Sequence, residues 1–238
     1  MNKLKHITFT GVDEKTVAGD IKILQEIQKE YPYVEFGVLT SYHWFENGNR
    51  YLDPRLFRYL TQAHLNLALH ICGEAAHDAA CGKDDEIHYL SWGKHQFFRR
   101  IQLNISNRQD NPPIVEPTPW GHEIIIQQKD VDHLDLYNAT RKDWKDYIGR
   151  LSVLLDASGG QGIDTDIKIL QTDKKVGYAG GFNPDNVEKK LSYLMENVNG
   201  PFWIDMETGV RTDDWFDINK VKKVLEICDP IVKEWEDK

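Results

Sequence analysis

The chain has 238 residues, of which 40% are hydrophobic and 28% charged, and its formal net charge at pH 7 is −9. This balance is typical of a folded globular protein, and the excess of acidic residues argues against non-specific nucleic-acid binding, which depends on neutralising phosphates with Lys and Arg. No run approaches the roughly 18 uncharged apolar residues that a membrane-spanning helix needs, so no membrane partner is expected.

The cysteines, Cys72, Cys81 and Cys228, are odd in number and share no regular spacing. A disulfide framework is therefore not expected, and reduced thiols are the default. The N-terminus passes directly into a strand-like pattern without an apolar signal segment. We expect a cytoplasmic protein.

Strand-like stretches recur along the whole chain, and helix-like segments separate most of them. Strands are expected at 6–12, 34–40, 66–72, 100–105 and 122–128, and in stretches beginning at 153, 176 and 202. Helices are expected at 16–29, after Asp53-Pro54, at 74–81, at 144–151 and after Asn183-Pro184. The stretches 82–95 and 106–121 are expected to be irregular.

The last three strands end in glycine-containing turns. Glycine lets the backbone approach a ligand closely, and the amides of successive glycines can cradle a phosphate beside a helix N-terminus. Helix-like sequence follows each turn, most clearly where Asn183 can cap a helix and Pro184 suits its first position. We therefore expect a repeated strand, glycine turn and helix unit that binds phosphate; the alternative is that the glycines only make tight turns. The turns lie within 156–162, 179–184 and 207–210.

This order of elements predicts the fold class. Strands alternating with helices at about 30 residues per unit form a parallel sheet, and eight such units with right-handed crossovers can close into a barrel. The chain length agrees with the roughly 250 residues of one such barrel. Because no linker or change in composition divides the chain, we expect one α/β domain, a (β/α)8 TIM barrel of the phosphate-binding type spanning residues 1–238.

Period-two alternation assigns each strand residue to the helix-covered face or to the barrel axis. Ile7, Phe9, Val153, Leu155, Ile204 and Met206 are expected to face the helices. Polar residues face the axis near the carboxyl ends of the strands, where barrel enzymes have their active sites, and a carboxylate buried there acquires a raised pKa that suits general acid catalysis. This inward set contains Thr10, Cys72, Asn104, Gln127, Asp156 and Glu207, with His70, Gln102, Trp203 and Asp205 below or beside them.

The last third of the chain resembles the phosphoribosylanthranilate isomerases, phosphate-binding barrels that catalyse an Amadori rearrangement in tryptophan synthesis. The similar segments are Leu154-Leu155-Asp156 with the glycines that follow, Ala179-Gly180-Gly181-Phe182-Asn183-Pro184-Asp185-Asn186-Val187, and Asp205-Met206-Glu207-Thr208-Gly209-Val210. The resemblance implies that Asp156 is the general acid that protonates the furanose ring oxygen. It implies a phosphate site at the amides around Gly160, Gly162, Gly180, Gly181 and Gly209, with Thr208 and Asn104 as further substrate contacts. Arg50, in a segment that follows an insertion, would then contact an anionic aromatic part of the substrate.

The chain departs from this family at two places that matter for catalysis. Thr10 precedes Gly11 where the family has its general base, a cysteine, and a threonine hydroxyl has no useful basicity near neutral pH. Glu207, Thr208 and Arg211 stand where the family has two serines before Gly-Val and an acid after it. Residues 73–150 resemble the family only weakly.

Three interpretations follow. The first is an isomerase acting on a phosphorylated sugar-like small molecule, with Asp156 as acid and Glu207 or Cys72 as the replacement base. The second is a barrel that kept the phosphate site but lost the isomerase chemistry, and binds a phosphorylated ligand or catalyses a different reaction. The third is a metal enzyme using His70, Cys72 and His77, but catalytic zinc needs three converging ligands, so no metal or other cofactor is expected. The oligomeric state and the true substrate are not predicted.

Overall fold

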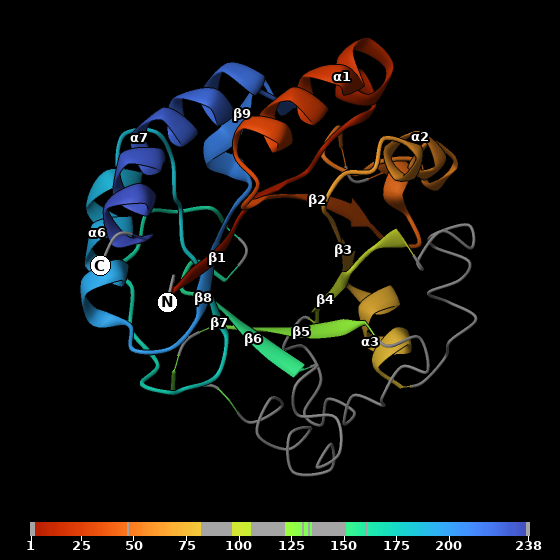
Figure 1. Ribbon diagram of the computed structural model, residues 1–238. Coiled ribbons are helices and arrows are strands. Elements are labelled where there is room, and N and C mark those ends of the chain that lie inside the picture. The colour runs from red at the N-terminus through yellow and green to blue at the C-terminus, as the bar shows by residue number, and fades with distance from the viewer. Residues whose placement is uncertain are drawn as a thin grey trace.

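The computed structural model describes residues 3–46, 48–81, 97–105, 122–129, 131–132, 134, 151–159 and 161–236. Eight strands form a closed barrel in which each strand pairs in parallel with the next and β8 pairs with β1 (Figure 1). The predicted (β/α)8 barrel is therefore confirmed. The strands are β1 (Leu4–Thr10), β2 (Val34–Thr40), β3 (Leu67–Cys72), β4 (Arg100–Asn104), β5 (Glu123–Gln128), β6 (Leu151–Asp156), β7 (Val176–Ala179) and β8 (Phe202–Met206).

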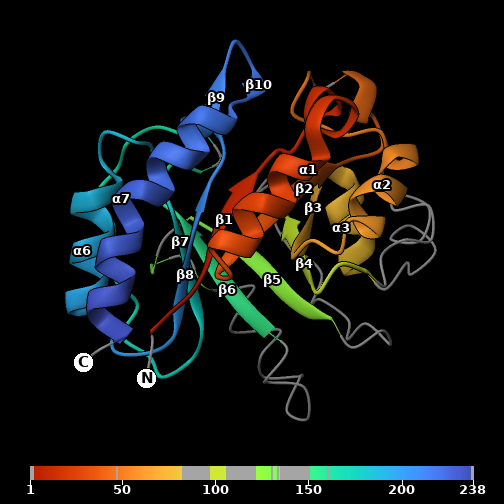
Figure 2. The same ribbon diagram turned by 45° about the horizontal axis from the view of Figure 1, so that its top comes forward.

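The helices pack outside the ring of strands (Figures 1 and 2). The longer ones are α1 (Glu14–Glu30), α2 (Phe57–Gln62), α3 (Glu74–Ala80), α6 (Val187–Asn197) and α7 (Ile218–Glu236). Short 3-10 helices occur at η1 (Trp44–Glu46), η2 (Pro54–Leu56) and η5 (Thr208–Val210), and a small hairpin is formed by β9 (Arg211–Thr212) and β10 (Trp215–Phe216). None of the helices among the described residues is both long and apolar enough to cross a membrane.

The predicted alternation of strand residues is correct. All six residues expected to face the helices belong to the large apolar core, as Ile7 and Phe9 illustrate with 0% exposure. A separate small cluster of Ile125, Leu154 and Trp203 lies inside the barrel. Gly177 makes room for it, because a Cβ at that position would collide with the indole of Trp203.

A charged network closes the barrel at the amino ends of the strands; we call Glu35, Arg100, Glu123 and Lys175 the floor network. Arg100 Nη1 lies 2.7 Å from Glu35 Oε1, and Lys175 Nζ lies 2.7 Å from Glu123 Oε2. The Arg100 guanidinium also stacks 4.1 Å from the centre of the Trp203 ring. Burial alone would raise the pKa values of Glu35 and Glu123, but the neighbouring cations outweigh it and both values are lowered.

Several predicted elements differ from the structure, and the first strand, expected at 6–12, spans Leu4–Thr10. Residues 161–175, between β6 and β7, contain no helix, because the β-branched Thr165, Ile167 and Ile169 are partly buried and alternate with exposed residues at the period of an extended chain. The helix expected after Asn183-Pro184 begins at Val187, and Leu151, expected to end a helix, begins β6. Residues 144–150 of the helix expected to end at Leu151, and both stretches expected to be irregular, lie outside the described residues.

Candidate active site

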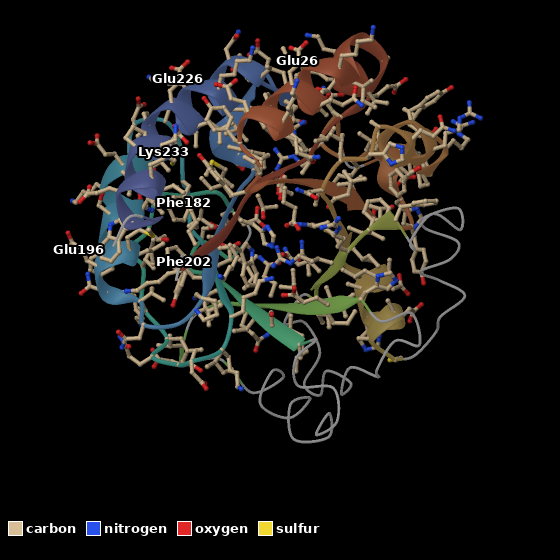
Figure 3. All side chains as sticks on the ribbon, viewed as in Figure 1. Glu26, Phe182, Glu196, Phe202, Glu226 and Lys233 are labelled. Carbon is tan, nitrogen blue, oxygen red and sulfur yellow. The ribbon has the colours of Figure 1, made fainter. Side chains whose placement is uncertain are left out.

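A cavity of about 600 Å³ opens at the carboxyl ends of the strands. Figure 3 shows nitrogen and oxygen atoms inside the ring of strands, whereas Glu26, Glu196, Glu226 and Lys233 project from the outer helices. The structure thus brings the predicted site residues into one place, apart from Gly160, which lies outside the described residues. Those lining the cavity are Thr10, Arg50, Cys72, Asn104, Asp156, Gly162, Gly180, Gly181, Glu207, Thr208 and Gly209.

Asp156 is the last residue of β6 and is only 6% exposed. Its Oδ2 accepts a hydrogen bond from Gln127 Nε2 at 2.8 Å, and its Oδ1 accepts from the Ser158 hydroxyl at 2.7 Å and the Ser158 amide at 3.1 Å. These three bonds come from β5 and from the turn after β6. They hold the carboxyl group in one orientation at the wall of the cavity.

Thr10 does not act alone at the position where the resemblance expects a base. Its hydroxyl donates a hydrogen bond to Asp205 Oδ1 at 2.7 Å across the paired ends of β1 and β8. Burial raises the pKa of Asp205 to about 8 despite this bond. Asp205 also lines the cavity, so a carboxyl group that titrates near neutral pH lies beside Thr10. Sequence analysis placed Asp205 inside the barrel but missed it as a candidate, although its inward position next to Thr10 was the available signal.

His70, which the sequence offered only as a metal ligand, is a second polar group inside the barrel. It is 2% exposed, and its Nε2 has no hydrogen-bond partner among the described residues. The space beside it exists because Gly37 has no side chain: a Cβ there would lie 3.0 Å from this nitrogen and would collide with the Thr10 hydroxyl. Burial lowers the pKa of His70 to about 4, so its imidazole is neutral at physiological pH.

Cys72 was one of the two expected replacements for the base. Burial raises the pKa of its thiol to about 11, which leaves it protonated near neutral pH. The Asn104 side-chain nitrogen lies 3.3 Å from the sulfur and holds it against the cavity wall. A neutral thiol is a poor base, so its environment does not favour this role.

Arg50 and Glu207 meet at the rim of the cavity. Arg50 Nη1 donates to Glu207 Oε1 at 2.8 Å, while its Nη2 and Nε donate to Asp214 Oδ1 at 2.7 and 3.2 Å. Burial raises the pKa of Glu207 even though Arg50 lowers it. Arg50, expected to contact an anionic substrate group, is therefore already engaged by two carboxylates.

The three glycine turns pack against one another. Gly181 has a φ of 70°, and a Cβ there would lie 2.5 Å from the backbone of Ile163 and Asp164. A side chain at Gly162 would collide with Thr208, and one at Gly209 would collide with the carbonyl of Phe182. The glycines thus allow the loops after β6, β7 and β8 to interlock, which is a packing role in addition to the expected one.

The interlocked loops also leave amides available to a ligand. Within the described ranges, no hydrogen bond from the backbone N–H of Gly180, Gly181 or Gly209 to another residue is found. Lys190 Nζ binds the carbonyl of Gly180 at 2.6 Å and Asp164 Oδ1 at 2.6 Å, so its charge stabilises the loops from behind. Successive unpaired amides of this kind suit an anion.

The residues of the metal interpretation do not converge. His77 Nδ1 lies 3.7 Å from Asp78 Oδ1 and 3.8 Å from the sulfur of Cys81, on α3 and its end rather than in the cavity. In the part of the chain that the structure describes, no group of three or more His, Cys, Asp or Glu side chains is arranged to hold a metal ion.

The structure is similar to three solved isomerases. It aligns with the phosphoribosyl anthranilate isomerase from Thermus thermophilus at 16% identity and a TM-score of 0.60, covering 95% of this chain and 99% of that one. The Pyrococcus furiosus enzyme, N-(5'-phosphoribosyl)anthranilate isomerase, gives 15% identity, a TM-score of 0.54 and coverages of 94% and 98%. The phosphoribosyl anthranilate isomerase from Thermococcus kodakaraensis aligns at 14% identity and a TM-score of 0.54, covering 94% of this chain and 98% of that one. At these identities the similarity shows the fold alone.

Sequence comparison adds evidence for the second half of the chain. No sequence among the curated proteins matches. The family model described as N-(5'phosphoribosyl)anthranilate (PRA) isomerase matches residues 121–227, which include all three interlocked loops. The resemblance found in the sequence is thereby confirmed: residues 121–227 carry the pattern of the PRA isomerase family, on a barrel that has diverged from the solved isomerases.

Proposed function

We propose that this protein isomerises a phosphorylated N-substituted ribosylamine, or a closely related sugar phosphate, by an Amadori-type aldose to ketose rearrangement. The observation that carries the proposal is the pair of buried carboxyl groups, Asp156 on β6 and Asp205 on β8, that line one cavity beside the glycine loops. Two carboxyl groups in different environments can divide acid and base roles between them.

The substrate phosphate binds at the loops after β6, β7 and β8. The amides of Gly180, Gly181 and Gly209 donate to its oxygens, and Thr208 lies beside them on η5. This placement orients the sugar with its reacting carbons over the barrel axis, where the carboxyl groups lie. Support comes from the family match, which covers these loops, and from the unpaired amides.

The rearrangement moves hydrogen within the substrate and needs no oxidant or reductant. Asp156 gives a proton to the ring oxygen as the C1–O bond breaks, and the nitrogen lone pair forms a C1=N bond. Removal of the C2 proton then forms a C1=C2 bond while the electron pair of the C1=N bond returns to nitrogen. The resulting enolamine takes up a proton at C1 as its C2 hydroxyl loses one, which gives the ketose.

Asp205 is the base in this proposal, and Thr10 is a positioning residue. The Thr10 hydroxyl binds Oδ1, which leaves Oδ2 of Asp205 without a hydrogen bond among the described residues. A pKa of about 8 makes the ionised carboxylate a stronger base than an ordinary aspartate while it is still populated near neutral pH. Cys72 is protonated and Glu207 is paired with Arg50, so both predicted replacements serve less well.

The second interpretation, a barrel that binds a phosphorylated ligand without this chemistry, rests on a specific observation. A threonine at position 10 cannot remove a carbon-bound proton by itself. If Asp205 does not take over that step, phosphate binding would remain and isomerisation would not.

The test is to measure isomerisation and binding separately. Ribosylamine 5-phosphates form in situ from labelled ribose 5-phosphate and anthranilate, aniline or 2-(dimethylaminomethyl)aniline, and the C2 ketone of the product is followed by 13C NMR. We expect product above the uncatalysed rate with at least one amine, and Asp156→Asn lowers that rate by about 100- to 10,000-fold. Calorimetric affinity for ribose 5-phosphate stays within about twofold in this variant, because the phosphate loops are unchanged.

Asp173→Asn is the matched control, because Asp173 carries the same charge on a side chain that is 87% exposed. It should leave both readouts unchanged. Binding of ribose 5-phosphate without ketose from any amine would contradict the isomerase proposal and favour the binding protein. An unchanged rate in Asp156→Asn would remove Asp156 from the mechanism.

A further inference from the structure

The surroundings of Arg50 point to the chemical class of the substituent on the sugar. All three nitrogen atoms of its guanidinium donate to carboxylates, Nη1 to Glu207 and the other two to Asp214. One positive charge therefore faces two negative charges, and this part of the cavity rim has a net charge of −1. An anionic substituent would have to displace Glu207 or add a third carboxylate beside one arginine.

The contacts of Asp214 show that this arrangement is built into the fold. Arg211 donates to the carbonyl of Asp214 from Nη2 at 2.6 Å and from Nε at 3.2 Å. The amide of Asn49 also donates to Asp214 Oδ2 at 3.3 Å. Asp214 lies in the turn of the β9–β10 hairpin with a φ of 61°. Withdrawing Asp214 from Arg50 would therefore disturb the hairpin as well as the ion pair.

The nearby cations do not restore a positive rim. Arg211 directs Nη1 to the carbonyl of Gly11 at 2.6 Å, and its charge is shared between Asp13, 3.4 Å from Nη2, and Asp214, 3.6 Å from Nε. Arg50 and Arg211 together therefore face three carboxylates, those of Glu207, Asp214 and Asp13, and the net charge stays at −1. Lys129 lines the cavity just after β5, and β5 lies opposite β1 in the ring of eight strands. Glu207 Oε2, by contrast, has no hydrogen bond within the described residues, although Glu207 lines the cavity.

We propose that the part of the cavity between Arg50 and Glu207 binds a positively charged or hydrogen-donating substituent, such as an ammonium or amidinium group, and disfavours a carboxylate. Glu207 Oε2 accepts the donor, and Arg50 holds Glu207 in place. This inference rests on the proposed function, since it concerns the substituent of the same phosphorylated sugar. The substituent on the nitrogen of the ribosylamine phosphate is therefore cationic or neutral rather than anionic.

Three stable probes of matched size test the proposal. Reductive amination of ribose 5-phosphate with anthranilate, aniline or 2-(dimethylaminomethyl)aniline, whose tertiary amine cannot condense, gives arylaminoribitol 5-phosphates that differ in a carboxylate, a hydrogen or a dimethylammoniomethyl cation. Calorimetric titration at pH 8 and low salt measures the three affinities. We expect the cationic probe to bind about tenfold or more tightly than the carboxylate probe, with the neutral probe between them.

Variants then locate the effect. Glu207→Gln keeps the size of the side chain and removes its charge, so it should reduce the difference between the cationic and carboxylate probes by about tenfold. Glu196→Gln removes the same charge from the exposed outer face of α6 and should leave the ratio within about twofold (Figure 3). Ribose 5-phosphate affinity should be similar in all three proteins.

The outcomes separate this inference from the proposed function. Tightest binding of the carboxylate probe, or equal effects of Glu207→Gln on every probe, would overturn the inference while a phosphorylated sugar remained the ligand. No binding of any probe or of ribose 5-phosphate would overturn the proposed function and this inference together.

Discussion

The two ends of the barrel bury carboxyl groups to a similar extent, yet their pKa values shift in opposite directions. Glu35 and Glu123 in the floor network have lowered values, whereas Asp205 and Glu207 in the cavity have raised ones. Desolvation is the largest contribution in all four and raises the pKa each time. The floor carboxylates lie 2.7 Å from Arg100 and Lys175, whereas Asp205 has only a hydroxyl at that distance. Glu207 keeps a raised pKa although Arg50 lies 2.8 Å away, because desolvation outweighs that cation.

The comparison assigns a different task to each end. A carboxylate with a buried cation beside it stays ionised and serves the structure, because removing either partner leaves a charge without compensation. A carboxyl group held only by a hydroxyl changes its protonation state near neutral pH and can transfer a proton. This division agrees with the general placement of stability at the amino ends and catalysis at the carboxyl ends of barrel strands.

The largest expected effect comes from breaking the floor network. Arg100→Met leaves Glu35 and Glu123 buried without their shared cation, and we expect it to lower the free energy of unfolding by about 3–5 kcal/mol. Urea unfolding followed by tryptophan fluorescence measures this. Arg58→Met, on the exposed face of α2, is the control and should change little. A small change in the free energy of unfolding of Arg100→Met would mean that water solvates the floor carboxylates in place of the guanidinium.

A smaller effect, of the opposite sign, is expected from Asp205. Its pKa of about 8 in the folded protein exceeds the 3.8 of an ordinary aspartate, so its contribution to folding stability is complete below about pH 4 and is lost as the pH rises through about 8. Asp205→Asn removes this loss and should be more stable than the unmodified protein at pH 8 by roughly 1–3 kcal/mol. Thermal unfolding at pH 5 and pH 8 measures the difference.

Glu35→Gln sharpens that result. The pKa of Glu35 is lowered in the folded protein, so its carboxylate stabilises the fold at pH values above its pKa in the unfolded chain. This variant should therefore be less stable at pH 8, where Asp205→Asn is more stable. The same sign in both variants would contradict the comparison between the two ends.

The pH dependence of turnover is expected to report the same carboxyl group. Since the ionised form of Asp205 is the proposed base, kcat/KM should rise about tenfold per pH unit below about 8 and then level off. Thr10→Val removes a donor that lowers the pKa of Asp205 and should move the profile upward by about 1 pH unit. A profile unaffected by Thr10→Val would show that another group titrates.

The smallest loss of stability is expected from breaking an ion pair on the surface that has the same nitrogen-to-oxygen distance as the pairs of the floor network. Lys168 Nζ lies 2.7 Å from Asp132 Oδ2, but the two side chains are 56% and 66% exposed. Lys168→Met should change the free energy of unfolding by less than about 0.5 kcal/mol, because water and salt screen such pairs. Urea unfolding of Lys175→Met, which removes a cation that is only 22% exposed and lies at the same distance from its carboxylate, provides the contrast and should give a clearly larger loss of stability.

Local sequence patterns were sufficient to predict the strands and their faces. The second strand has the expected bounds, 34–40, since a short apolar run bounded by turn residues defines a buried strand. The partners of inward residues were not predictable in the same way. Arg100 and Glu35 are 65 positions apart, and Arg50 and Glu207 are 157 apart. Alternation indicates that a side chain faces the axis, but the barrel register decides which side chain it meets there.

The interlocked loops after β6, β7 and β8 have a consequence for how such a barrel can change over time. Since Gly162, Gly181 and Gly209 each occupy a space that no larger residue fits, these loops, which we propose bind the phosphate, tolerate little variation in sequence. The rim at Arg50 and Glu207 depends on side chains, which single substitutions can exchange. Substitutions at the rim can therefore change which substituent the proposed site accepts without disturbing the interlocked loops.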